Sequence, residues 1–188
     1  MKTCLDPIID SQSRVVILGT LPGGESLRLA QYYADPANGF WRMLDAVFEE
    51  TIGESYAARV DFLKAKGLAL WDVLRSADRL GSVDVSIRDG VANDFASLFA
   101  RHRSLTTVVF NGSKAERLFR SLVWAALVRT VDGLCLVRVA SSSSTPGRYV
   151  PPFPVKVAQW KAALRVTGTS GRYQGGSAAT QPAHAQDR

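Results

Sequence analysis

The sequence predicts an α/β protein built around a mostly parallel, four-stranded sheet with helices on both faces. Four short apolar runs are typical of buried strands, because they are rich in β-branched residues and lack the alternation of a half-exposed strand. These runs are residues 14–18, 68–71, 105–110 and 134–139. Segments with helical spacing separate the runs, which is the arrangement of parallel strands joined by crossover helices.

The helices are expected from apolar residues at three- and four-residue spacing and from capping signals. The clearest is 40–50, whose large apolar side chains share one face. Ser113 and Glu116 fit a capping box, so a helix is expected from there to about Trp124. In chain order, the expected helices are a short one near 25–31, then 40–50, 55–66, one starting at Asn93 or Asp94, 113–124, and 154–165.

Three segments are expected to be irregular or disordered. Residues 75–90 are polar and show no clear period, and 141–154 form a loop rich in Ser, Thr, Pro and Gly. Residues 167–188 are rich in Gly, Ser, Ala, Gln and Thr with little apolar content, which favours disorder. We therefore expect one folded domain over 1–166 and a disordered tail over 167–188.

Composition narrows the classes of function. The net charge of +6 over 188 residues is compatible with binding a polyanion but does not establish it. Cys4 and Cys135 are too few for a disulfide framework, and no Cys/His cluster predicts a metal site. No apolar run approaches the roughly 20 residues of a membrane span. The first residues lack a signal-peptide pattern, so we expect a cytoplasmic protein.

Small and polar residues follow each of the four predicted strands. Ligands of open α/β sheets bind beyond the carboxyl ends of the strands, so these residues indicate a site at that edge. In strand order, the segments are Gly19–Gly24, Asp72, Asn111–Ser113 and Ser141–Arg148. The Gly-rich turn lacks the G-K-[ST] ending of a P-loop and does not fit G-x-G-x-x-G. By itself it indicates only a tight turn.

The segment Gly19–Trp41, GTLPGGESLRLAQYYADPANGFW, resembles the first motif of the hypoxanthine-DNA glycosylase family. This family is a branch of the uracil-DNA glycosylase superfamily, and its motif is close to G-[ST]-x-P-[GS]-x-x-S-L-x-x-x-Q-Y-Y-A-H-P-x-N-x-F-W. Further similarity follows in order at GLALWDVL (67–74), NDF (93–95), FNGSKAERLF (110–119) and around Trp160. The resemblance spans about residues 10–165. It implies a three-layer α/β/α sandwich around a short, mostly parallel sheet.

The resemblance implies a monofunctional DNA glycosylase of base excision repair. Its expected substrate is single- or double-stranded DNA with a deaminated base, most of all hypoxanthine, and no metal or organic cofactor is expected. Asn38 matches the family's catalytic residue, and Tyr33 matches the aromatic residue that stacks on the extruded base. The other expected base contacts are Gly19, Thr20, Leu21, Pro22, Asp72 and Asn111. Expected DNA-backbone contacts are Gly23, Gly24, Ser142, Ser143, Ser144, Thr145 and Arg148.

The residues suit the chemistry of base removal. A base inside a duplex must be extruded before its glycosidic bond can be cleaved. An amide has no useful basicity, so we expect the carbonyl of Asn38 to orient a water beneath the sugar. Backbone N–H groups around 20–24 would stabilise the departing base. The side chain of Asn111, both donor and acceptor, would read the base edge.

Two positions depart from the family pattern. Asp35 stands where the family has His, which changes the charge beside Asn38. The second motif of the family reads close to P-S-T-S-P, whereas this chain has Ser142 at the leading position. These departures affect the expected substrate range and the conformation of the loop that faces DNA.

Structural interpretations of the same residues remain open. Tyr32 and Tyr33 could pack on the helix at 40–50, Asn111 could serve a turn, and Asp72 could cap the next segment. His102 is expected at a helix end rather than in catalysis. The alternative functions are a uracil- or mismatch-directed glycosylase of the same superfamily, a non-catalytic damaged-DNA-binding module, and a nucleotide-binding protein that uses the Gly-rich turn. A monomer without an obligate protein partner requires no extra assumption.

Overall fold

The computed structural model describes residues 2–78, 88–143 and 150–165. A parallel sheet forms its centre, with strand order β3-β2-β6-β7. The strands are β2 (Val15–Gly19), β3 (Leu68–Asp72), β6 (Thr107–Asn111) and β7 (Cys135–Val139). Val15 pairs with Leu68 on one side and Thr107 on the other, and the register continues without a shift. The predicted parallel sheet is confirmed.

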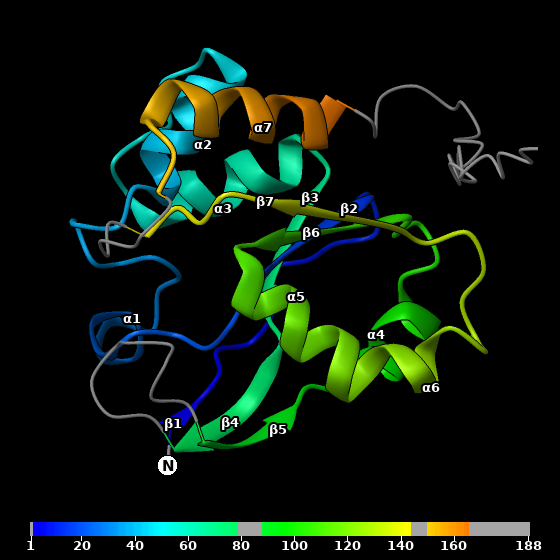
Figure 1. Ribbon diagram of the computed structural model, residues 1–188. Helices are drawn as coiled ribbons and strands as arrows, with labels where there is room; N and C mark the ends of the chain where they lie inside the picture. Colours follow the sequence, from blue (N-terminus) through cyan, green and yellow to red (C-terminus); the bar gives the residue numbers. More distant parts are fainter. Residues whose placement is uncertain (1, 79–87, 144–149, 166–188) are drawn as a thin grey trace, which may run out of the picture.

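Helices cover both faces of this sheet, so the predicted three-layer sandwich is confirmed (Figure 1). One layer contains α2 (Phe40–Phe48), α3 (Tyr56–Ala65) and α7 (Phe153–Arg165). The opposite layer contains α4 (Phe95–Arg101), α5 (Ser113–Phe119), the π-helical turn η2 (Arg120–Trp124) and α6 (Ala125–Leu127). The short α1 (Gly24–Leu29) lies apart from both layers, toward the end of the sheet.

Large aromatic side chains fill the space between the layers. Trp160 of α7 is fully buried and meets Phe40 of α2 edge to face, with ring centroids 5.9 Å apart. On the other face of the sheet, Phe119 of α5 packs against Phe110 of β6. Burying side chains of this size stabilises the fold by roughly 1.5–3 kcal/mol each. The Trp160–Phe40 contact also fixes α7 against the start of α2.

A second, antiparallel sheet corrects the expectation of an irregular segment at 75–90 at both ends of that segment, whereas 79–87 lie outside the described residues. Its order is β1-β4-β5, formed by β1 (Lys2–Thr3), β4 (Leu74–Asp78) and β5 (Arg88–Ala92). The register shifts twice along β4, between Leu74 and Ser76 and between Ser76 and Asp78. Such irregularities interrupt the alternation of buried and exposed residues, so no period of two is visible in the sequence.

Helix ends agree with the predictions at α4 but not at α5. The side chain of Asp94 accepts a hydrogen bond from the N–H of Ser97, and His102 is the residue that ends α4. The predicted capping box at Ser113 is absent, because Gly112 is the N-cap and Ser113 is already helical. Gly112 has φ of 101°, a conformation that favours glycine.

Some predictions fall outside the described residues. These are the disordered tail at 167–188 and the DNA-contact candidates Ser144, Thr145 and Arg148. Within the described ranges, every helix is too short or too polar to span a bilayer.

Candidate active site

A cleft of about 840 Å³ opens where the parallel strands end. Small-molecule sites commonly have volumes of roughly 300–1,000 Å³. The predicted base-contact residues all line it: Gly19, Thr20, Leu21, Pro22, Tyr33, Asp72 and Asn111. Asn38, Gly23, Ser142 and Ser143 line it as well, so residues far apart in the sequence meet at the predicted edge of the sheet.

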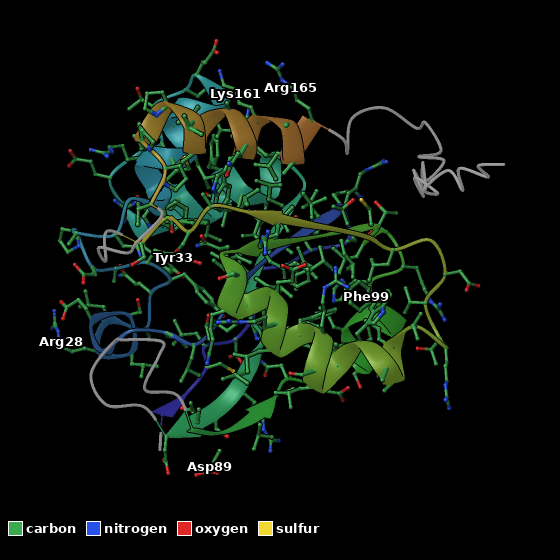
Figure 2. All side chains as sticks on the ribbon, viewed as in Figure 1. Arg28, Tyr33, Asp89, Phe99, Lys161 and Arg165 are labelled. Carbon is green, nitrogen blue, oxygen red and sulfur yellow. The ribbon has the colours of Figure 1, made fainter. Side chains whose placement is uncertain are left out.

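Tyr33 combines a packing role with a place in the cleft wall. It adopts φ of 52° in the segment between α1 and α2 (Figure 2). Its ring stacks on Phe40, with centroids 3.9 Å apart and planes inclined by 11°. Its hydroxyl accepts a hydrogen bond of 2.8 Å from Nδ2 of Asn111. The ring is therefore held from behind and at its tip.

Tyr32 has a structural role instead. Its hydroxyl donates a hydrogen bond of 3.1 Å to the carbonyl of Leu5, and its side chain is buried. Burial, followed by the nearby charge of Asp72, raises the pKa of Tyr32 above its ordinary value. The hydroxyl thus stays protonated, as a donor to Leu5 must be.

The carbonyl of Asn38 is already occupied. Its Oδ1 accepts hydrogen bonds from the N–H of Phe40 at 3.1 Å and from Oγ of Ser142 at 3.0 Å. The backbone N–H of Phe40 can only donate, so it determines which end of the amide faces it. Nδ2 of Asn38 makes no hydrogen bond to any described part of the chain. This corrects the expected use of the carbonyl, because both lone pairs of Oδ1 are already used; among the described residues, Nδ2 is the end of the amide that can still bind a ligand.

Ser142 joins Asn38 to Asn111. Ser142 is only 4% exposed, and its N–H donates to Oδ1 of Asn111 at 2.8 Å. Nδ2 of Asn111 donates in turn to Oγ of Ser142 at 2.9 Å. The carbonyl of Ser142 accepts from the N–H of Gly39 at 3.1 Å. The sequence predicts that Ser142 contacts the DNA backbone. In the structure its hydroxyl is buried and forms hydrogen bonds with Asn38 and Asn111.

Asn111 has little hydrogen-bonding capacity left for a ligand. Both N–H bonds of its Nδ2 are used, by Tyr33 and by Ser142, and one lone pair of Oδ1 is used by the N–H of Ser142. One lone pair of Oδ1 remains. Asn111 can therefore accept from a base edge but cannot donate to one in this arrangement.

Asp72 and Gly19 approach each other closely across the two central strands. Asp72, the last residue of β3, is 4% exposed, lines the cleft, and pairs in register with Gly19. A Cβ at Gly19 would lie 2.5 Å from Oδ1 of Asp72 and 3.1 Å from the hydroxyl oxygen of Tyr33. Any larger residue at position 19 would require the carboxylate of Asp72 to move. The next segment is the strand β4 rather than a helix, so Asp72 does not cap a helix.

Three side chains of α7 hold the backbone that carries Ser142, and the sequence analysis missed their role. Nζ of Lys156 donates to the carbonyls of Ser141 at 2.8 Å and Ser143 at 3.5 Å. The side-chain oxygen of Gln159 accepts a hydrogen bond from the N–H of Ala140, and the indole N–H of Trp160 donates one to the carbonyl of Ala140. The spacing of 156, 159 and 160 puts them on one helix face. Lysine is rarely buried, and no pattern in the sequence distinguishes Lys156 from a solvated lysine.

Carboxylates and cations occupy different parts of the cleft wall. Asp35 and Glu25 line it near α1, and Asp35 is exposed at the rim, where Oδ1 accepts from the N–H of Ala37. Arg138 and Lys156 line the side nearer β7 and α7, and burial lowers the pKa of Lys156. Within residues 2–78, 88–143 and 150–165, no group of three or more His, Cys, Asp or Glu is placed to hold a metal ion.

The Gly-rich turn presents backbone rather than side chains. Gly23 is the N-cap of α1 and lines the cleft. Gly24, the first residue of α1, is exposed and is absent from the cleft lining, and a Cβ there would meet nothing within 4 Å. Of these two predicted DNA contacts, Gly23 therefore lies in the cleft wall and Gly24 beside it.

Known proteins share both the sequence and the fold. The profile of the uracil DNA glycosylase superfamily matches residues 7–167. Two relatives are named hypoxanthine DNA glycosylase. The one from Methanosarcina barkeri is 39% identical over 115 residues, covering 61% of this chain and 73% of the relative. The one from Methanosarcina acetivorans is 38% identical over 126 residues, covering 65% of this chain and 80% of the relative.

A solved structure extends the comparison to nearly the whole chain. The solution NMR structure of a candidate uracil DNA glycosylase from Methanosarcina acetivorans superposes with a TM-score of 0.72 and 31% sequence identity. The match covers 89% of this chain and 99% of that one. With a family profile matching most of its length and a similar fold, the chain belongs to the uracil DNA glycosylase superfamily.

Proposed function

We propose that this protein is a monofunctional DNA glycosylase of base excision repair that removes hypoxanthine from DNA. The observation that carries the proposal is the cleft itself, which brings Tyr33, Asn38 and Asp72 together at the strand ends of a superfamily member. Two relatives named for hypoxanthine support this choice of base. Hypoxanthine arises by deamination of adenine, and its mispairing makes extrusion easier.

The walls of the cleft suit an extruded purine with an N–H on its edge. The ring of Tyr33 offers a stacking surface, and stacking on an aromatic is worth roughly 1–3 kcal/mol per base. Oδ1 of Asn111 and the carboxylate of Asp72 are acceptors. Hypoxanthine has an N–H at N1, where adenine has a lone pair. Acceptors at that edge would bind hypoxanthine and repel adenine.

The reaction that we propose is hydrolysis. The bond from C1′ to the base breaks, the sugar becomes oxocarbenium-like, and a water adds to C1′. The hydroxyl of that water ends on the sugar and one proton ends on the released base. Backbone N–H groups around Thr20–Gly23 stabilise the negative charge of the leaving base. Nδ2 of Asn38 holds the water by donating to its oxygen, since an oxocarbenium ion needs a positioned nucleophile more than a strong base.

Base release from defined duplexes tests this function. We expect release of free hypoxanthine from a duplex with one deoxyinosine, and slower release of uracil from a matched deoxyuridine duplex. Asn38→Ala should slow release by about 10²- to 10³-fold, the loss typical when a positioning donor is removed. Gln12→Ala, an exposed amide beyond the opposite end of β2, is the matched control and should act as wild type. No release from either duplex would refute the enzymatic proposal.

A uracil-directed glycosylase is the second candidate. Uracil also carries an N–H on its edge, so the acceptors at Asn111 and Asp72 suit it as well. Faster release of uracil than of hypoxanthine would select this candidate. A duplex bound tightly without any turnover would instead favour a damaged-DNA-binding module.

The proposed reaction also indicates the working form of the protein. We propose that the protein acts as a monomer, because residues of one chain line the whole cleft. Since its substrate is single- or double-stranded DNA, we propose that it works in the compartment that holds the DNA. In a cell without a nucleus, that compartment is the cytoplasm. Sedimentation of the free protein at micromolar concentration checks the monomer, and a stable dimer would contradict it.

A further inference from the structure

A second hollow, of about 250 Å³, adjoins the cleft. It shares five lining residues with the cleft: Asn38, Ser142, Ser143, Pro151 and Lys156. The rest of its wall comes from the residues before and within the first turn of α2 and from the start of α7. Asn38 and Ser142 therefore stand between the two spaces. We propose that this second hollow binds a phosphate of the DNA backbone next to the extruded nucleotide, an inference that rests on the proposed function.

The charges around the hollow favour an anion. Arg42 and Lys156 line it, and none of the described residues in its wall is Asp or Glu. The backbone N–H groups at the N-terminus of α2 add partial positive charge, and no acidic residue in the first turn offsets it. The main cleft differs, because Glu25, Asp35 and Asp72 line it. Of the two spaces, only the smaller one has charged lining residues that are all cations among the described residues.

Arg42 is held over an aromatic ring at the wall of the hollow. Its Cζ lies 4.4 Å from the ring centroid of Phe153, so the guanidinium rests over an aromatic ring. In the part of the chain that the structure describes, no carboxylate forms an ion pair with it, whereas Arg28 pairs with Glu25. A guanidinium held by stacking keeps the N–H groups of its edge available, and these match two oxygens of a phosphate.

Lys156 supplies a second cation from below. It is 8% exposed, and within the described residues its hydrogen bonds go to backbone carbonyls and not to a carboxylate. Keeping an ammonium away from water costs free energy unless an opposite charge lies near it. A phosphate in the hollow would provide that charge. Its site would then be complete only when DNA is bound.

The arrangement of the two spaces matches the geometry of a nucleotide. In a nucleotide the sugar lies between the base and the phosphate. The cleft takes the base, and Asn38 stands at the boundary, where the sugar must lie. The hollow on the other side of Asn38 is then within reach of the neighbouring phosphate. A free phosphate ion has the same chemistry, so the test must separate these two sources.

The salt dependence of DNA binding tests the site. Dissociation constants would be measured from low to moderate KCl for an undamaged duplex and for one with a stable abasic analogue. Arg42→Gln should weaken binding about tenfold near 0.1 M salt and reduce the slope of log K against log salt by about 0.9, the share of one phosphate. Arg42→Lys should keep the slope but lose part of the affinity, because lysine lacks the fork.

Arg165→Gln is the matched control. Arg165 is exposed at the end of α7 that lies away from Phe153 and the hollow (Figure 2). Its loss removes the same charge, and we expect the slope to stay at the wild-type value. Equal slopes for Arg42→Gln and Arg165→Gln would overturn the phosphate site even if hypoxanthine is released normally. A reduced slope for Arg42→Gln alone would support the site even if no base is released.

Inorganic phosphate separates the two sources of the anion. At constant ionic strength, replacing chloride by phosphate should leave DNA binding nearly unchanged if the hollow takes the backbone phosphate. Displacement of DNA by millimolar phosphate that is lost in Arg42→Gln would assign the hollow to free phosphate and overturn the DNA assignment. Thermal unfolding of each variant, with melting temperatures equal to wild type, confirms that the effects are local.

Discussion

The two walls of the cleft are built in opposite ways. The wall after β6 and β7 is fixed by side-chain hydrogen bonds, with Ser142 joined to Asn38 and Asn111 and with Lys156 behind it. The wall after β2 is backbone with small side chains, starting at Gly19. The first arrangement positions a functional amide, and the second lets other groups come close. Activity should therefore depend on hydrogen-bond donors at one wall and on the absence of side-chain atoms at the other.

Gly19→Ala should have the largest effect. The new Cβ would lie 2.5 Å from Oδ1 of Asp72 and 3.1 Å from the hydroxyl oxygen of Tyr33, so both must move. We expect loss of at least about 10²-fold in hypoxanthine release and a stability loss of about 1–3 kcal/mol from overpacking. Base-release kinetics and urea unfolding measure the two effects.

Gly24→Ala is the control for that substitution. A Cβ at Gly24 meets nothing within 4 Å, and the residue is helical, so stability should rise by about 0.5–1 kcal/mol. Equal losses at Gly19 and Gly24 would show that the glycine-rich turn responds to any substitution. The close approach of Asp72 to Gly19 would then not be the cause of the loss in Gly19→Ala.

Lys156→Met should have the next largest effect on activity and stability, because the carbonyls of Ser141 and Ser143 lose their hydrogen-bond donor. We expect a stability loss of about 1–3 kcal/mol at neutral pH, the cost of leaving buried acceptors without a donor. Hypoxanthine release should fall by about tenfold, since Ser142 would no longer be held against Asn38. Lys161→Met, at a half-buried lysine of α7 that pairs with Glu49 and does not contact the Ser141–Ser143 backbone, should retain wild-type release.

The pH dependence of stability gives Lys156 a separate readout. Burial lowers the pKa of Lys156 in the folded state, so the unfolded chain binds more protons at pH values between the folded and unfolded pKa. In that window, which ends at the ordinary pKa of lysine, this group makes wild type more stable as pH rises. Lys156→Met should lack that contribution, and parallel stability curves for the two proteins would contradict it.

Ser142→Ala should have the smallest effect on activity. It removes the donor to Oδ1 of Asn38 and the acceptor for Nδ2 of Asn111, but the N–H of Phe40 still holds Asn38. A loss of about threefold to tenfold in the rate of release, with little change in KM, is expected together with about 1 kcal/mol of stability. Ser113→Ala alters an exposed hydroxyl in the cleft wall and should change neither the rate of release nor the stability. A rate change as large at Ser113 as at Ser142 would contradict the role of the braced wall.

Local patterns in the sequence predicted what depends on neighbouring residues. The four parallel strands coincide with the short apolar runs, and burial of every residue of β2 and β3 explains why these two strands lack alternation. The small and polar residues after each strand correctly predicted which edge of the sheet carries the cleft. The capping box failed because Gly112, with φ of 101°, takes the N-cap position. The register shifts of β4 removed the alternation that would have revealed it.

Contacts between distant residues could not be predicted from spacing. Ser142 and Asn38 are 104 positions apart, and their hydrogen bond exists only once β7 lies beside β6 and α7 covers the loop. The same holds for Lys156, whose partners belong to the segment before its helix. The resemblance in sequence indicated that Asn38 matters. The positions of Phe40 and Ser142 were needed to determine which end of the Asn38 amide can bind a ligand.

The single-turnover rate of hypoxanthine release from a deoxyinosine duplex, compared between wild type and Asn38→Asp, tests the central claim most directly. Aspartate keeps an acceptor for the N–H of Phe40 and the hydroxyl of Ser142 but lacks the Nδ2 donor. The account predicts release by wild type and a loss of about 10²-fold or more in Asn38→Asp at every pH tested, with DNA affinity changed far less. No release by wild type, or a rate in Asn38→Asp close to that of wild type, would contradict it.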